Sequence, residues 1–98
     1  MKRLLLALII CTQALADDGL IAEAKAAVTR DFKDPYSAVF EGIYMSKDAR
    51  GSPVVCGTVN AKNSYGAFTG RRRFYYAASL AFVDTGRGDD IVLKALCG

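Results

Sequence analysis

The 98-residue chain lacks histidine and tryptophan, and it contains only three cysteines and two prolines. Without histidine, the commonest general base at neutral pH is missing, and zinc sites lose their usual nitrogen ligand. The sequence has no Cys-x-x-Cys pair, and its serines and carboxylates show no spacing typical of a nucleophile or an acid–base pair. We therefore expect no metal, no cofactor and no enzymatic activity, with a hydrolase-type enzyme as the least favoured interpretation.

The N-terminal segment has the three parts of a cleavable export signal. A basic start is followed by the apolar run Leu4–Cys11 and by an A-x-A motif that ends at Ala16. The run is shorter than the ~20 apolar residues of a membrane-spanning helix, and a buried N-terminal helix is the alternative. We expect residues 1–16 to be a signal peptide cleaved between Ala16 and Asp17. Residues 17–98 would then be a single domain, periplasmic or secreted, without a transmembrane segment.

Cleavage would change the charge balance and the cysteine count. The 13 basic residues would become 11 against the same 10 acidic ones, so the net charge would fall from +3 to +1. A charge this small gives no global argument for nucleic-acid binding. Cys56 and Cys97 would remain, and in an oxidising compartment they have one intramolecular pairing. That disulfide would contribute roughly 4 kcal/mol in the chain-entropy model; separate buried thiols or an intermolecular bridge are the alternatives.

The hydropathy pattern predicts one helix followed by strands. Gly19–Lys33 has apolar residues at helical spacing, which predicts an amphipathic helix that ends before Pro35. Asp34 is placed to cap a short turn that starts at this proline. The period then becomes two, and the predicted strands are Ala38–Met45, Val54–Ala61 and Arg72–Val83. The expected fold is α+β: one N-terminal helix on an antiparallel sheet of three to four strands, joined by one disulfide.

Some details of these elements are also predicted. Thr85–Asp90 is expected to be a loop, whereas Asp89–Cys97 fits either a short strand or a helical turn. Pro53 can open the second strand only as its first residue. In the first strand, alternation predicts one face with Val39, Ile43 and Met45 and another with Phe40 and Tyr44.

Arg71 and the first two residues of the third predicted strand form a run of three arginines, which is followed by three aromatic residues. Cations beside rings are typical of surfaces on which nucleic-acid bases stack. Strand alternation, however, separates Arg71 and Arg73 from Arg72. A solvated strand start that leads into a core strand is the alternative, with core positions at Phe74, Tyr76, Ala78, Leu80 and Phe82.

The connection before this strand, Asn60–Gly66, is rich in polar and aromatic side chains, as recognition loops often are. The alternative is a hairpin in which asparagines supply local hydrogen bonds. A hairpin would bring the connection and the arginines together. The predicted recognition surface consists of Asn60, Lys62, Asn63, Tyr65, Arg71, Arg72 and Arg73.

The segments Lys33–Phe40 and Cys56–Gly66, with Gly70 and Phe74, resemble a family of small exported proteins of proteobacteria and their prophages. The core of the resemblance is Cys-Gly-x-Val-Asn-x-Lys-Asn. The family has no assigned activity, so the resemblance implies a bacterial periplasmic setting and no mechanism. The arginine triplet and the tail from Leu80 lie outside the pattern.

These observations favour a small periplasmic or secreted binding module that acts on an envelope component, for example as an inhibitor or exclusion factor. An envelope protein or an acidic glycan or lipid surface is the expected partner, and nucleic acid is not. A structural or stress-related envelope protein without a specific ligand is the alternative. Burial of Tyr65 would favour that alternative, whereas exposure of Lys62, Tyr65 and one of the arginines would favour a binding module.

Overall fold

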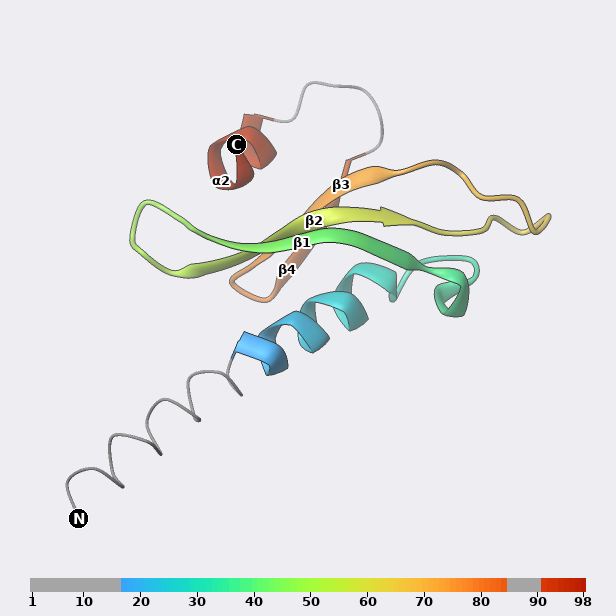
Figure 1. The fold of residues 1–98 in the computed structure, drawn as a ribbon, viewed down its shortest axis with the longest axis horizontal. Coiled ribbons are helices and arrows are strands. Elements are labelled where there is room, and N and C mark those ends of the chain that lie inside the picture. Colours follow the sequence, from blue (N-terminus) through green and yellow to red (C-terminus); the bar gives the residue numbers. More distant parts are fainter. Residues whose placement is uncertain (1–16, 85–90) are drawn as a thin grey trace, which may run out of the picture.

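The structure, a computed structural model, describes residues 17–84 and 91–98; the predicted signal peptide and the predicted loop Thr85–Asp90 lie outside them. Within the described residues, an antiparallel sheet of four strands lies between two helices (Figure 1). Helical residues 17–29, called the N-terminal helix below, cover one face, and α2 (Ile91–Cys97) covers the other. In order across the sheet, the strands are β1 (Val39–Lys47), β2 (Pro53–Asn60), β3 (Arg72–Ala77) and β4 (Leu80–Val83).

The predicted α+β class and antiparallel sheet are confirmed, but the prediction of a single helix is wrong. The C-terminal segment was predicted to form either a short strand or a helical turn, and it is helical over Ile91–Cys97. Pro53 is the first residue of β2, as expected for a residue that cannot donate to the ladder.

Apolar side chains join the N-terminal helix to the sheet. The ring of Phe74 lies at the centre of this core and meets the ring of Phe40 edge-on, with centroids 5.5 Å apart. Phe74 is paired across the strands with Gly57, where an added Cβ would lie 3.1 Å from the phenyl ring. Glycine at position 57 therefore makes room for the phenyl ring. The buried residues of this cluster are Ala24, Val28, Val55, Val59, Phe74 and Tyr76.

The N-terminal helix ends at Thr29 and does not continue to Lys33 as predicted. The amide of Phe32 donates to the Thr29 carbonyl, which forms a tighter turn and lets Phe32 pack against the core. A short 3₁₀ turn, η1 (Pro35–Ser37), follows after Asp34. The predicted turn is present, but the Asp34 side chain does not cap it; instead, the Ser37 hydroxyl donates to the Asp34 main-chain oxygen.

A β-bulge in β1 changes the predicted faces of this strand. Glu41 pairs with Thr58 and Tyr44 with Cys56, so two residues of β1 oppose Gly57 alone. Gly42 has φ +61°, a conformation that glycine adopts without steric cost. After the bulge the side chains change face, so Phe40 packs on the same core as Ile43 and Met45. The prediction that Val39 shares their face and Phe40 does not is therefore wrong.

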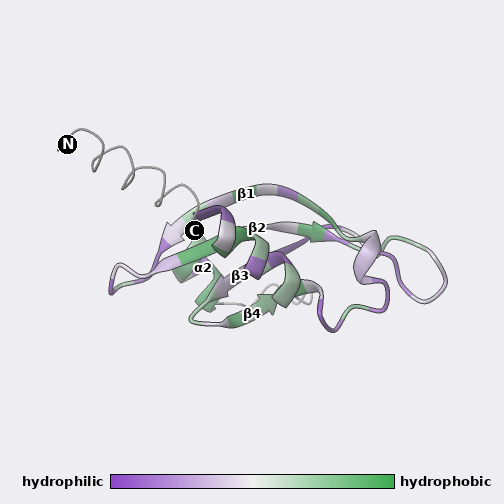
Figure 2. Ribbon diagram, turned by 90° about the horizontal axis from the view of Figure 1, so that it is seen from below, coloured by the Kyte–Doolittle hydropathy of each residue, from purple (hydrophilic) through white to green (hydrophobic). Residues whose placement is uncertain are grey.

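The third predicted strand is in fact a hairpin. Ala77 pairs with Leu80 around Ala78 and Ser79, which have φ values of +50° and +64°. Positive φ at both central residues is typical of a two-residue hairpin turn, but such turns usually carry Asn-Gly. The sequence Ala78-Ser79 does not indicate a turn, and the alternation of apolar residues continues through it. The turn therefore could not be recognised from the sequence. Phe74 and Tyr76 are buried as predicted, whereas Leu80, in the wholly apolar β4 (Figure 2), is 70% exposed.

On the sheet face opposite the N-terminal helix, a disulfide attaches α2 to β2. Cys56 of β2 and Cys97 of α2 form the predicted disulfide, with Cα atoms 5.9 Å apart. Tyr44 and Ser46 of β1 donate to the main-chain oxygens of Cys97 and Leu96. These hydrogen bonds satisfy carbonyls that a helix C-terminus leaves without partners.

Candidate functional site

The connection between β2 and β3, residues 61–71, is called the β2–β3 loop below, and asparagine side chains organise it. The Asn63 side-chain oxygen accepts from the amides of Tyr65 and Ala67, at 2.9 and 3.2 Å. At the base of the loop, the Asn60 side-chain oxygen accepts from the Gly70 amide at 3.0 Å. The two predicted asparagines therefore fix the loop backbone, so they act as structural residues, and their side-chain oxygens are already occupied.

A second contact ties the loop to the rest of the molecule. The Lys62 amide donates to the Ser37 hydroxyl of η1 at 2.8 Å, and Lys62 is bridged to Phe68 across the loop. The Lys62 ammonium lies 5.4 Å from the centre of the Phe68 ring, within the range of a cation–π interaction. Lys62 is half-buried as a result.

Tyr65 is 95% exposed between these anchored parts of the loop. Its amide is hydrogen-bonded to Asn63, so its backbone position is set although its ring contacts solvent. Phe68, half exposed, adds a second aromatic surface beside Lys62. Tyrosine is a residue type that is enriched at binding hot spots, so this exposed ring is a candidate contact residue.

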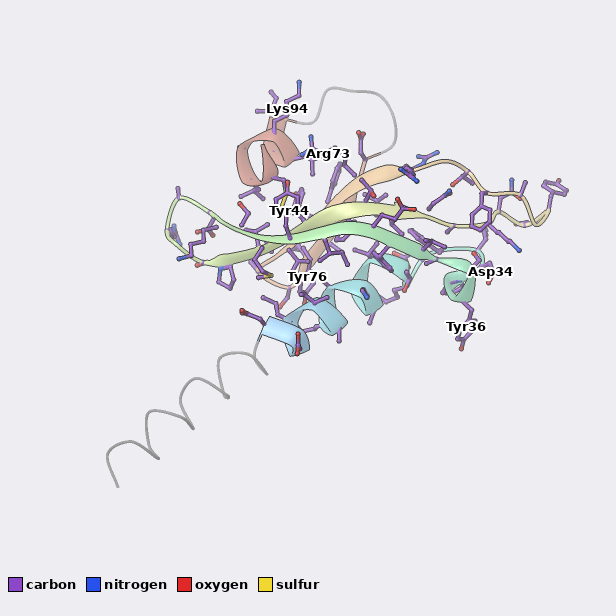
Figure 3. All side chains as sticks on the ribbon, viewed as in Figure 1. Asp34, Tyr36, Tyr44, Arg73, Tyr76 and Lys94 are labelled. Carbon is purple, nitrogen blue, oxygen red and sulfur yellow. A yellow bond between two sulfur atoms is a disulfide. The ribbon has the colours of Figure 1, made fainter. Side chains whose placement is uncertain are left out.

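The three arginines of the predicted surface lie in three different environments. Arg71 is exposed and pairs with Glu41 of β1 at 2.9 Å. Arg73 donates to the main-chain oxygen of Gly98 at 2.7 Å, and Figure 3 shows it on the α2 side of the sheet with Tyr44. Its positive charge lies at the C-terminus of α2, where the helix dipole favours a cation. Arg72 faces the opposite side, as strand alternation predicts.

Arg72 lines a cleft of about 320 Å³ on the face of the N-terminal helix. Lys62 and Asn63 of the β2–β3 loop line the same cleft, so the fold brings three of the predicted residues together here. Tyr65, Arg71 and Arg73 do not line it. The remaining lining residues are Asp31, Phe32, Lys33, Val59, Ala61, Thr69, Val83 and Asp84.

Sequence reasoning did not identify the other polar side chains of this cleft. Lys33 follows the N-terminal helix, Thr69 lies late in the loop, and Asp84 follows β4. No local spacing connects positions so far apart in the chain. Correct placement of the end of the helix and of the β3–β4 hairpin would have been needed to find them.

One polar contact lies on the same face but outside the cleft. The Tyr76 hydroxyl donates to the Glu23 carboxylate at 2.8 Å and links β3 to the N-terminal helix (Figure 3). This hydrogen bond, together with burial, raises the pKa of Tyr76 above its ordinary value of 10.0. The contact stabilises the docked helix and does not touch the residues of the predicted surface.

Residues 17–84 and 91–98 contain no group of three or more histidine, cysteine or acidic side chains placed to hold a metal ion. No helix in these same ranges has the length and apolar character needed to cross a bilayer. No protein-family model matches the chain, and neither a curated protein nor a solved structure matches it. The resemblance to small exported proteins of proteobacteria therefore stays a prediction.

Proposed function

We propose that this protein is an exported binding module of the bacterial envelope, and that the β2–β3 loop contacts its partner through Tyr65. An inhibitor or exclusion factor that acts on an envelope component is the form of this activity that we favour. The exposure of Tyr65 carries the proposal, because its ring lies on a loop whose backbone is held at both ends. Lys62, Phe68 and Arg71 extend the contact surface beside it.

Positive charge near the tyrosine favours an acidic partner. Lys62 has no carboxylate within ion-pair distance among the described residues, and Arg71 shares its charge with Glu41 at an exposed position. Exposed ion pairs are each worth only ~0.2–1 kcal/mol. Affinity would therefore come from the aromatic side chain, and the cations would orient the partner.

The Cys56–Cys97 disulfide supports the export part of the proposal, since such bonds persist in oxidising compartments. The predicted cleavage between Ala16 and Asp17 and the resemblance to small periplasmic proteins support the same location. Mass spectrometry of the periplasmic protein tests it: we expect an N-terminus at Asp17. A product that retains residues 1–16 would contradict the proposed export.

The loop is tested by cross-linked capture from periplasm with the wild type and three variants. Tyr65→Ala and Lys62→Ala/Arg71→Ala should lose the captured partner while the melting temperature changes little. Tyr36→Ala is the matched control, because Tyr36 is also fully exposed but lies in η1 and outside the loop (Figure 3). Equal capture by Tyr65→Ala and wild type would contradict the proposal. Early unfolding of the loop variants would instead favour a purely structural protein, the alternative function.

A further inference from the structure

The cleft beside the β2–β3 loop contains a cation, Arg72, that makes no ion pair with another residue of the part of the chain that the structure describes. The Arg72 side chain is half-buried, and its guanidinium has no hydrogen-bond or ion-pair partner among residues 17–84 and 91–98. Its neighbours in the triplet differ, because Arg71 pairs with Glu41 and Arg73 with Gly98. A guanidinium partly removed from water without a partner is costly, and an anion in the cleft would compensate that cost.

The other lining groups limit the charge of such an anion. Among the lining residues that the structure describes, Lys33 and Lys62 add two positive charges to that of Arg72, while Asp31 and Asp84 add two negative ones. The lining therefore has a net charge of +1 when all five groups are ionised. A carboxylate, with one negative charge, balances it, whereas a phosphate monoester would bring a second charge close to two aspartates.

The floor of the cleft favours an apolar body on that anion. Phe32, Val59 and Val83 line it together with the small Ala61. The volume of about 320 Å³ corresponds to roughly ten water molecules at ~30 Å³ each, enough for a short alkyl or branched aliphatic group. A cleft that combines apolar and polar side chains in its lining is typical of sites that bind small ligands.

We propose that this cleft binds an apolar monocarboxylate, with the carboxylate held by Arg72 and the aliphatic part on Val59 and Val83. A medium-chain fatty acid and an apolar C-terminal residue of a peptide share this chemistry. The inference does not rest on the proposed function of Tyr65, since Tyr65 does not line the cleft and Lys62 alone is common to the two surfaces. Failure of the cleft proposal can be told apart from failure of the Tyr65 proposal, because the test below uses the purified protein without a partner.

The experiment is calorimetric titration of the purified, disulfide-bonded protein with octanoate, and with N-acetyl-leucine as the peptide-like probe. We expect saturable binding of at least one probe in the millimolar range or tighter. Octanol and inorganic phosphate, which carry only the apolar or only the anionic part, should bind much more weakly. Binding of octanoate alone would indicate that the ligand is a fatty acid, and binding of acetyl-leucine alone would indicate a peptide C-terminus. Either result supports a site for an apolar monocarboxylate.

Two substitutions of Arg72 and one control variant locate the carboxylate. Arg72→Gln should weaken binding about tenfold or more, because a charge-assisted hydrogen bond is lost. Arg72→Lys should restore part of the affinity, since it keeps the charge but loses the planar fork. As the control, Arg50→Gln, at an exposed position between β1 and β2 that does not line the cleft, should change the affinity less than about twofold.

Wild-type protein gives an independent test if a variant fails to fold. In methyl NMR spectra, the ligand should shift the signals of Val59 and Val83, while those of Val92 in α2 stay in place. Equal affinity for octanol and octanoate would overturn the role of Arg72. Absence of binding by both carboxylates, or ligand shifts confined to other methyl groups, would overturn the cleft as the site.

Discussion

The two faces of the sheet are covered in different ways. The N-terminal helix is held by buried apolar side chains around Phe74, with one hydrogen bond from Tyr76 at its edge. The seven-residue α2 buries Leu93 alone and is held by the disulfide and by side chains that donate to its C-terminal carbonyls. A short helix cannot bury enough surface to dock by itself, so on this face a covalent bond replaces the missing core.

The largest expected effect is on the apolar face. Phe74→Ala should lower the free energy of unfolding by about 3–5 kcal/mol, because it removes a fully buried ring and leaves a cavity above Gly57. Urea denaturation measures the change. Phe82→Ala is the matched control, because Phe82 stacks on Tyr75 and is only half-buried. This substitution should lower the free energy of unfolding by less than half as much as Phe74→Ala. Similar costs for the two variants would contradict the assignment of the main core to one face.

The disulfide face should be affected next most strongly. Cys56→Ala/Cys97→Ala should cost about 2–4 kcal/mol through the greater entropy of the unfolded chain. Hydrogen exchange sharpens the comparison between the faces: the amides of α2 should lose protection, while those of the N-terminal helix keep most of theirs. Equal loss of protection in both helices would show that the two faces do not fold as separable parts.

The smallest expected effect concerns pH. Because the Tyr76 pKa is raised in the folded protein, the native state keeps a proton that the unfolded chain releases above about pH 10. The free energy of unfolding should therefore fall as the pH rises from 10 toward the folded-state pKa. Tyr76→Phe should remove the part of this decrease in stability that comes from Tyr76, as measured by urea denaturation between pH 8 and 11. An unchanged alkaline slope in the variant would contradict the contribution of the Tyr76–Glu23 contact.

Sequence patterns predicted what depends on composition and regular periodicity. The disulfide joins the two cysteines that lie outside the predicted signal peptide, and Phe74 and Tyr76 are buried where strand alternation places them. The patterns failed where one residue changes the period: Gly42 adds a bulge to β1, and Ala78 begins a turn without glycine or asparagine. Both errors come from backbone conformations that alternation does not encode.

The candidate site was predicted in part for a related reason. Tyr65 and Lys62 belong to one continuous loop, so sequence reasoning could group them. The separation of Arg72 from Arg71 and Arg73 also follows from alternation, but their different partners do not. The cleft joins Lys33, Thr69 and Asp84, and only the packing of the helix, the loop and the β3–β4 hairpin brings these positions together.

The pairing of Phe74 with Gly57 has a consequence for how this sequence can diverge. Gly42 is required for its backbone angle, so asparagine, which tolerates positive φ, is an acceptable replacement there. Gly57 is required for space: an added Cβ would meet the Phe74 ring at 3.1 Å and the Ile43 backbone at 3.2 Å. A smaller residue at position 74 would relieve only the contact with the ring, so position 57 is expected to remain glycine among homologues even where position 74 varies. Position 42 should vary independently of both.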